Sequence, residues 1–493
     1  MNAIPDKKEK GKGAVIAFAI GDALGWPNER RSAALPYNKN YISNFKKWNR
    51  RSGGRYWSHS ETILPGEYSD DTQLMLSISR SLLSGSDWAE YFTKHELTFW
   101  RQYERGGGSA VLRAADQWSK GKKPWEDKEN RAYYYAGGNG SAMRILPHVI
   151  KGADLSDFKI IYDEIVKDSM LTHGHPRAIL GALCYAYAVY YLLLKKSTLN
   201  YCELISAVSN NVGLWGRLPE KIDGDWVLRC NKYYNFSTEW LNTCEIITKN
   251  LKAVEEALSI GALEIERDTL TALGCFDSKI SGAGDIAAVA AIYFASKYAN
   301  NPVLGIKQAA NLFGADTDTI AAMTGGLMGS LCGLEWIPYE WRLVQDYKCL
   351  ELIGECLVSD NGFEELRGII GQNQDNQFIR MEIGKAKQVD QYVINSGKSG
   401  LINIRKYLTV LGQTIYIKEY KRIKSIEMVH STISIDVNQL EELLKNENSS
   451  NITLKEVMYI RKLKIEGNTP ADIAQKLSIK QEVLLKLFNI ITF

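Results

Sequence analysis

Two short acidic motifs, far apart in the sequence, contain the residue types that bind hard divalent cations. The first is Ser69-Asp70-Asp71-Thr72 and the second is Asp316-Thr317-Asp318-Thr319. Each precedes an apolar run with helical spacing, so either motif alone is typical of a helix N-cap. Together, four carboxylates and several hydroxyls at two helix starts form the oxygen ligand set that Mg²⁺ and Mn²⁺ prefer. Bound cations would also relieve the repulsion among these carboxylates.

A glycine-rich segment, residues 136–144, is suited to contact with a phosphate. Gly137, Gly138 and Gly140 permit close approach of the backbone, and Ser141 can cap a following helix. The free N–H groups at such a helix start attract an anion. An ordinary helix start is the alternative interpretation of this segment.

The chain resembles the ADP-ribosylglycohydrolase family, which includes the dinitrogenase-reductase-activating glycohydrolase. The matching blocks occur in the family's order over roughly residues 11–340, namely 21–25, 65–72, 138–144, 172–173 and 314–319. Ser69 stands where threonine is commoner, and Ala315 replaces a common glycine; neither change removes a metal ligand. The resemblance implies an all-α orthogonal bundle with a two-metal site at the bottom of an ADP-ribose cleft.

The resemblance also implies the ligands of two Mg²⁺ or Mn²⁺ ions. They would be Ser69, Asp70, Asp71, Asp316, Asp318 and Thr319. Asp70 or Asp71 would take a proton from the attacking water, and the sequence leaves the choice between them open. Glu29 would be an acid/base or gating carboxylate on a mobile loop, with a solvated surface glutamate as the alternative.

Substrate contacts follow from the same match. The residues implied are Gly138, Asn139, Gly140, Ser141, Met143 and His173. Without the match, His173 would be read as a hydrogen-bonded core or loop histidine. The loop Arg105-Gly106-Gly107-Gly108 either covers the cleft or simply connects two helices.

The function expected from these residues is metal-dependent hydrolysis of the N- or O-glycosidic bond between ADP-ribose and an acceptor. The expected substrate is an ADP-ribosylated protein or nucleic acid, and the sequence leaves the acceptor open among arginine, serine, another side chain, a nucleobase and a free small molecule. Such hydrolysis passes through an oxocarbenium-like state, so the site must hold the sugar and deliver water. One alternative is a DNA-binding regulator that senses ADP-ribose without turnover, and another is a catalytically silent relative. The intact ligand set argues against the silent relative.

The elements that position these motifs are predicted to be helices. Between residues 11 and 358, apolar residues recur at three- and four-residue spacing in 14–24, 72–83, 88–103, 178–194, 286–298 and 320–334. Gly325, Gly329 and Gly333 form a stripe that favours close packing of another helix. Residues 178–194 are uncharged and just long enough to span a membrane, but their four tyrosines and several alanines favour a buried core helix.

Composition places the chain among globular proteins without a membrane span. It has 493 residues, 45% of them hydrophobic and 24% charged, and a net charge of +3, which does not by itself indicate nucleic-acid binding. Its eight cysteines contain no C-x-x-C pair. We therefore expect a cytoplasmic protein.

The C-terminal quarter differs in composition from the rest. Residues 375–493 hold 18 Lys and Arg against 13 Asp and Glu, so this part carries the excess positive charge. A polar stretch at 371–377 suits a linker, and short strands are predicted at 402–404, 413–417 and 432–435. The predicted division is a catalytic domain at 1–370, a small α/β region at 375–450 and a helix-turn-helix unit at 452–493.

The helix-turn-helix prediction rests on two capping boxes. They are Thr469-Pro470-Ala471-Asp472 and Ser478-Ile479-Lys480-Gln481. In the final helix Lys480, Gln481 and Lys486 could contact DNA. Docking of a partner protein is an equal alternative, because both roles use the same fold.

Basic and aromatic residues are interleaved in residues 30–57, between Glu29 and Ser69. The basic members are Arg30, Arg31, Lys46, Lys47, Arg50, Arg51 and Arg55. This composition suits phosphate contact and base stacking, so the segment would read the acceptor at the cleft mouth. An amphipathic packing segment is the alternative.

Overall fold

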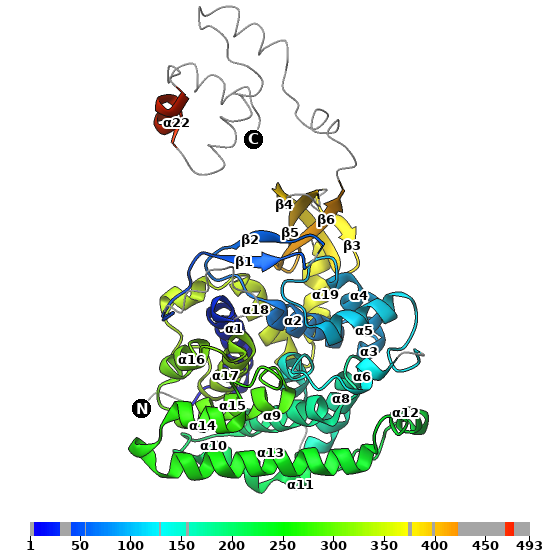
Figure 1. Cartoon of the computed structure of the whole chain (residues 1–493), viewed down its shortest axis with the longest axis vertical. Helices are drawn as coiled ribbons and strands as arrows, with labels where there is room; N and C mark the ends of the chain where they lie inside the picture. Colours follow the sequence, from blue (N-terminus) through cyan, green and yellow to red (C-terminus); the bar gives the residue numbers. More distant parts are fainter. Residues whose placement is uncertain are drawn as a thin grey trace, which may run out of the picture. The chain divides into compact units, whose positions relative to one another are not determined.

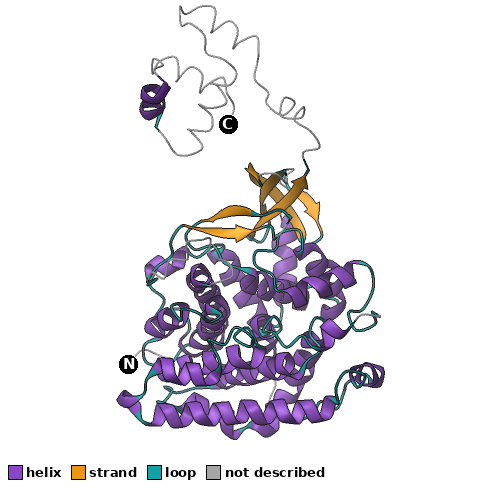
Figure 2. Ribbon diagram, viewed as in Figure 1, coloured by secondary structure: helices purple, strands orange, loops and turns teal. Residues whose placement is uncertain are grey.

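The computed structural model describes residues 4–29, 41–54, 56–127, 130–153, 157–372, 377–396, 400–422 and 469–477. Helices make up most of this part of the chain, and strands form two small sheets beside them (Figures 1 and 2). The prediction of a mainly α-helical body is therefore confirmed.

Two helices from opposite ends of the catalytic region form the centre of this body. Helix α1 (Lys7–Gly25) and helix α17 (Thr317–Cys332) are buried along most of their length. Their backbones touch at glycines: a Cβ on Gly325 would lie 2.0 Å from the carbonyl oxygen of Ala17, which only glycine avoids. At the far end, Thr317 Oγ1 donates to the carbonyl oxygen of Gly25 (2.9 Å). This contact fixes the start of α17, and with it the second acidic motif, beside the end of α1.

The apolar segment predicted at 178–194 is helix α9 (Pro176–Leu194). It is long and apolar enough to cross a membrane, but 78% of its most apolar window is buried inside the protein. It packs against α8 (Phe158–Met170) and α15 (Gly284–Lys297). The interpretation as a core helix is confirmed.

The remaining helices enclose this centre, and α13 is the longest of them (Figure 1). Their bounds are α2 (Asp70–Leu82), α3 (Trp88–Tyr91), α4 (Leu97–Trp100), α5 (Ser109–Ser119), α6 (Arg131–Tyr134), α7 (Leu146–Gly152), α10 (Glu203–Asn210), α11 (Val212–Trp215), α12 (Gly224–Cys230), α13 (Phe236–Ser259), α14 (Glu266–Leu273), α16 (Pro302–Ala310), α18 (Tyr347–Val358) and α19 (Gly362–Gln372). Short helical segments are η1 (Trp26–Asn28), η2 (Phe92–Glu96), η3 (Ala142–Arg144), η4 (Gly261–Leu263) and η5 (Tyr339–Leu343).

A β-hairpin that the sequence pattern did not predict lies within the helical region. Strands β1 (Trp48–Ser52) and β2 (His59–Ile63) pair antiparallel, with Trp48 opposite Ile63 and Ser52 opposite His59. The side chains of Arg50 and Glu61 point inward as a buried pair. Because charged residues occupy inward positions, the hairpin lacks the alternating apolar residues from which a strand is predicted.

The second sheet has the order β3-β4-β5-β6, with strands β3 (Ile379–Met381), β4 (Gly384–Asn395), β5 (Leu401–Thr409) and β6 (Thr414–Lys421). The strands predicted at 402–404 and 413–417 fall in β5 and β6, while 432–435 lies outside the described residues. The described parts of 377–422 contain strands and no helix. This part of the predicted α/β region at 375–450 is therefore a sheet. Residues Met1–Lys398 and Ile402–Tyr420 form one compact unit, so most of this sheet belongs with the helical body.

The second unit comprises Ser399–Leu401 and Lys421–Phe493, and its described helix is α22 (Pro470–Leu477). The predicted capping box is present at its start: Thr469 Oγ1 donates to Asp472 Oδ2 (2.6 Å), and the Asp472 amide donates back to Thr469 Oγ1 (3.3 Å). The second predicted helix, with Lys480, Gln481 and Lys486, lies outside the described residues.

Candidate active site

A cavity of about 540 Å³ brings the two acidic motifs together with the glycine-rich segment. The predicted site residues that line it are Glu29, Asp70, Asp71, Gly138, Asn139, Gly140, Met143, His173, Asp316, Asp318 and Thr319. Ser69 and Ser141 lie behind this lining and are fully buried. The fold thus gathers residues from chain segments nearly 290 positions apart.

The first motif begins helix α2, and Asp22 of α1 holds it in place. The buried Asp22 carboxylate accepts hydrogen bonds from the amide of Ser69 (3.0 and 3.1 Å) and from the amide and hydroxyl of Thr72 (3.0 and 2.6 Å). The sequence analysis gave Asp22 no role. Its signal was a single aspartate within the apolar run 14–24, where an ionisable side chain must find partners.

Ser69 is the N-cap of α2, as its residue type predicts. Its hydroxyl accepts from the Asp71 amide (3.3 Å) and donates to Asp71 Oδ2 (3.2 Å). The Asp71 carboxylate is buried and also interacts with the Thr319 side chain, so the two acidic motifs meet here. A buried carboxylate that no cation among the described residues pairs with is suited to an external cation.

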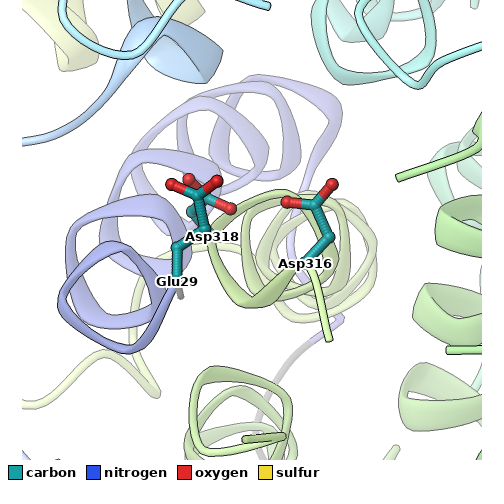
Figure 3. A group of neighbouring side chains, drawn as sticks. All are labelled: Glu29, Asp316 and Asp318. Carbon is teal, nitrogen blue, oxygen red and sulfur yellow. The ribbon is translucent and has the colours of Figure 1, made fainter. Parts of the chain in front are cut away.

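The second motif joins Glu29, which follows η1. Carboxylate oxygens of Glu29, Asp316 and Asp318 all lie within 4.8 Å of one another (Figure 3). Glu29 is only partly exposed, so it is part of a cluster and not an isolated surface glutamate. We call Glu29, Asp70, Asp71, Asp316 and Asp318 the acidic cluster.

The acidic cluster is electrostatically unfavourable by itself. Burial raises the pKa of Asp70, Asp71 and Asp318 well above the usual range of an aspartate, and neighbouring carboxylates raise it further. Among the described residues, none of the four aspartates forms an ion pair with a lysine, arginine or histidine. Like charges held together in a buried site are typical of a place where a cation binds.

The glycine-rich segment supports this cluster. Asn139 Nδ2 donates to Asp316 Oδ2 (2.9 Å), and the Asn139 amide donates to the carbonyl oxygen of Gly282 (3.0 Å). A Cβ on Gly282 would lie 3.1 Å from Asp316 Oδ2, so this position also needs a small residue. Asn139 thus orients an acidic side chain, a role that the sequence analysis did not assign, and Gly282 was missed altogether.

A second buried group of polar residues borders the same cavity. We call Arg144, His148, Asp168, Thr172 and His173 the Arg144 network. Arg144 Nε donates to Asp168 Oδ1 (2.8 Å), and its NH1 group donates to the carbonyl oxygen of Gly140 (2.9 Å) and to Thr172 Oγ1 (2.8 Å). His148 Nε2 lies 3.0 Å from Asp168 Oδ2. Although burial alone would raise the pKa of Asp168, Arg144 and His148 hold it below its usual value.

This network sets the protonation of His173. Burial lowers the pKa of His173 to about 3, so the ring is neutral at physiological pH. The Thr172 hydroxyl accepts from Arg144, which leaves its own hydrogen for His173 Nδ1 at 2.7 Å. We therefore assign the remaining ring proton to Nε2, beside Gly138 and Gly140. His173 presents a hydrogen-bond donor at the cavity wall.

Comparison with known proteins identifies the family of the chain. A family model described as ADP-ribosylglycohydrolase matches residues 3–365. The chain belongs to the ADP-ribosylglycohydrolase family. The resemblance drawn from the motifs is therefore confirmed.

Individual relatives are distant. An ADP-ribosyl-[dinitrogen reductase] glycohydrolase of Rhodospirillum rubrum is 25% identical over 38% of this chain, which spans 60% of that protein's length. ADP-ribosylhydrolase ARH3 of Danio rerio is 25% identical over 67% of this chain and 85% of its own. ADP-ribosylarginine hydrolase Tri1 of Pseudomonas putida (strain GB-1) is 23% identical over 68% of this chain and 73% of its own. A solved structure, titled an ADP-ribosylglycohydrolase-related protein complex, matches at 20% identity with a TM-score of 0.47, covering 72% of this chain and 98% of that one.

The wall of the same cavity also contains positively charged side chains. Arg50, Arg51 and Arg113 line the cavity, and so do Gly106–Gly108 of the predicted loop. Arg50 and Arg51 come from the basic and aromatic segment; its members Arg30, Arg31 and Arg55 lie outside the described residues. The family match ends at residue 365, so strands β3–β6 lie beyond it.

Proposed function

We propose that the protein is a metal-dependent ADP-ribosylglycohydrolase that cleaves the N- or O-glycosidic bond between ADP-ribose and an acceptor. The observation that carries the proposal is the acidic cluster, whose buried aspartates form no ion pair with a cation among the described residues and line a cavity of about 540 Å³. The names of the Rhodospirillum rubrum and Pseudomonas putida relatives refer to ADP-ribosylated dinitrogen reductase and ADP-ribosylarginine. An ADP-ribosylated protein is therefore the first substrate to test, and an ADP-ribosylated nucleic acid is the second.

The residues present fit a divalent cation. Their donors are carboxylate and hydroxyl oxygens, and Ser69, Asp71, Asp318 and Thr319 are buried. We propose two Mg²⁺ or Mn²⁺ ions held by Ser69, Asp70, Asp71, Asp316, Asp318 and Thr319. Such ions would supply positive charge and Lewis acidity toward oxygens of the ribose and the attacking water.

The chain's own residues would transfer protons and bind the substrate. Asp70 or Asp71 accepts a proton from the attacking water, with the partly exposed Glu29 as an acid/base or gating carboxylate. The neutral His173 donates a hydrogen bond from Nε2 beside the Gly138–Gly140 backbone, which suits a sugar or phosphate oxygen. Arg50, Arg51 and Arg113 attract the diphosphate of the substrate by their charge.

The test is release of ADP-ribose from an ADP-ribosylated model protein, followed with Mg²⁺, with Mn²⁺ and without metal. We expect turnover only with metal. Binding of ADP-ribose without turnover on any member of a panel of arginine, serine and nucleic-acid substrates would favour the sensor role instead.

For residues 452–493 we propose binding of duplex DNA. The support is the excess positive charge of the C-terminal quarter and the capping box that begins α22. Lys480, Gln481 and Lys486 are the proposed contacts. Gel-shift titration of the full chain and of a chain ending at Asn451, across salt concentrations, tests it; equal affinity of the two chains, or no binding at low salt, would favour the docking of a protein partner.

A further inference from the structure

Strand β6, which lies beyond the family match, inserts two side chains into a buried cluster of charges. We call Arg50, Glu61, Glu67, Arg105, Tyr416 and Lys418 the Arg105 network. Lys418 Nζ lies 2.8 Å from Glu61 Oε2, and the Tyr416 hydroxyl donates to Glu67 Oε1. The side chains of Glu61 and Lys418 are 0% and 6% exposed, so water does not screen this pair.

Arg105 lies at the middle of this network. Its NH2 group is 3.3 Å from Glu61 Oε1 and 3.0 Å from Glu67 Oε2. Its guanidinium carbon lies 4.3 Å from the ring centre of Tyr416, as in a cation–π contact. Each acidic partner of Arg105 is thus also held by a residue of β6, and the Tyr416 ring covers the guanidinium.

The backbone of the same arginine reaches the acidic cluster. The carbonyl oxygen of Arg105 accepts from the Asp70 amide (3.1 Å), and its own amide donates to Gln73 Oε1 (3.2 Å). The next residue, Gly106, has φ +122°, and a Cβ there would lie 2.6 Å from Asp70 Oδ1. Gly106, Gly107 and Gly108 all line the cavity. A displacement of Arg105 would therefore move both the Asp70 helix start and the cavity wall.

Loss of either β6 side chain would leave a buried charge short of a partner. Without Lys418, the cations that remain near Glu61 among the described residues are Arg50 at 3.4 Å and Arg105 at 3.3 Å. A buried carboxylate that loses its nearest cation is strongly destabilised, so the local structure rearranges or admits water. The rearrangement would begin at Glu61 and Glu67 and pass to Arg105, because they share its NH2 group.

We propose that β6 supports the proposed catalytic site from outside the cavity, with Tyr416 and Lys418 as positioning residues. They hold Arg105 and, through its backbone, Asp70 and the Gly106–Gly108 loop. The effect on turnover rests on the proposed function, whereas the effect on loop order does not. A sheet that merely packs against the helical body would stabilise the protein without this specific link.

The test compares Lys418→Met and Tyr416→Phe with Arg405→Met. Arg405 pairs with Glu419 at 2.9 Å on the exposed face of the same sheet, so its variant removes one positive charge outside the network. Hydrogen–deuterium exchange is measured for peptides covering residues 67–72 and 103–108, together with kcat, KM and thermal melting. We expect exchange in these peptides to rise about tenfold in the two network variants and not in the control. We expect kcat to fall about 10- to 100-fold, with a smaller change in KM, since slight misplacement of a reacting group is costly.

Lower melting temperature with unchanged exchange and unchanged kcat would overturn the proposal, because it would show a packing role alone. A wild-type protein without turnover would refute the proposed function, yet the exchange results would still decide the positioning role. Should Lys418→Met fail to fold, Tyr416→Phe decides by the same exchange measurement, since it removes only a hydroxyl. Lys418→Arg, which retains the charge, should restore most of the wild-type protection.

Discussion

The acidic cluster and the Arg144 network lie at the same cavity, but they differ in how their buried carboxylates are compensated. In the Arg144 network the aspartate is paired: Asp168 faces Arg144 and His148, and its pKa is held low despite burial. In the acidic cluster Asp70, Asp71 and Asp318 face other carboxylates, and their pKa values are raised. The first arrangement pairs its charges within the protein, whereas the second is where we propose that a cation binds. The comparison separates residues that bind from residues that hold others in place.

Of the tests of this comparison, we expect removal of metal to change turnover the most. Exhaustive chelation should abolish release of ADP-ribose, because the acidic cluster then carries uncompensated negative charge where the sugar and water must bind. Mg²⁺ or Mn²⁺ added back should restore turnover, and it should raise the melting temperature by binding the folded state alone. Turnover that survives chelation would contradict a metal-dependent site.

Asp316→Asn tests a member of the acidic cluster. We expect turnover to fall on the order of 10²- to 10³-fold, since metal ions contribute several kcal/mol at a transition state. The melting temperature of metal-free protein should not fall, because the change removes one of several like charges. Asp268→Asn, an exposed aspartate in the first turn of α14, is the matched control and should leave both quantities unchanged. Near-normal turnover would reduce Asp316 to a helix cap.

Arg144→Met tests the Arg144 network, in which the buried aspartate is paired. It leaves Asp168 buried with only His148 as an ionic partner, so we expect the free energy of unfolding to drop by about 3–5 kcal/mol. Chemical denaturation monitored by circular dichroism measures it. Arg229→Met breaks an exposed pair with Asp225 and should leave the free energy of unfolding nearly unchanged. If Arg144→Met lost turnover at full stability instead, the distinction between binding and holding residues would be wrong.

Glu29→Ala should impair turnover more than binding of ADP-ribose. An acid/base group contributes about 10²- to 10⁴-fold to rate, so we expect a fall toward the lower end of that range with an affinity within a few-fold of wild type. Calorimetric titration with ADP-ribose and steady-state kinetics separate the two quantities. Equal losses in both, or in neither, would reject the role.

The smallest effect is expected for titration of His173. Its pKa of about 3 lies below the ordinary histidine value of 6.5, so its ring resonances should not shift between pH 5 and 8 in nitrogen-15 NMR spectra. The unfolded chain takes up a proton first as pH falls below 6.5, and His173 therefore lowers stability progressively until about pH 3. The spectra should also show the proton on Nε2. Thr172→Val removes the hydroxyl that faces Nδ1 and should relax this preference.

Part of this site was predictable because its signals are local. The two acidic motifs were identified from residue types at helix starts, and α2 and α17 do begin there. The stripe predicted at Gly325, Gly329 and Gly333 indicated close approach, and the first two positions meet backbone of α1. Gly333 instead follows the last residue of α17 as its C-cap. The β1–β2 hairpin was missed because ion-paired Arg50 and Glu61 occupy inward positions that apolar residues usually take.

The sequence by itself determined which residues could bind a cation, where their helices begin and to which family the chain belongs. The tertiary structure decided what each of those residues touches. Asp22 holds the start of α2 from 47 residues away, Asn139 orients Asp316 across 177 residues, and Tyr416 reaches Glu67 across 349. No local pattern encodes such partners, because a hydrogen bond depends on distances that only the packed chain sets. Helix starts and glycine spacing follow from neighbouring residues, whereas the pairing of buried charges follows from the fold.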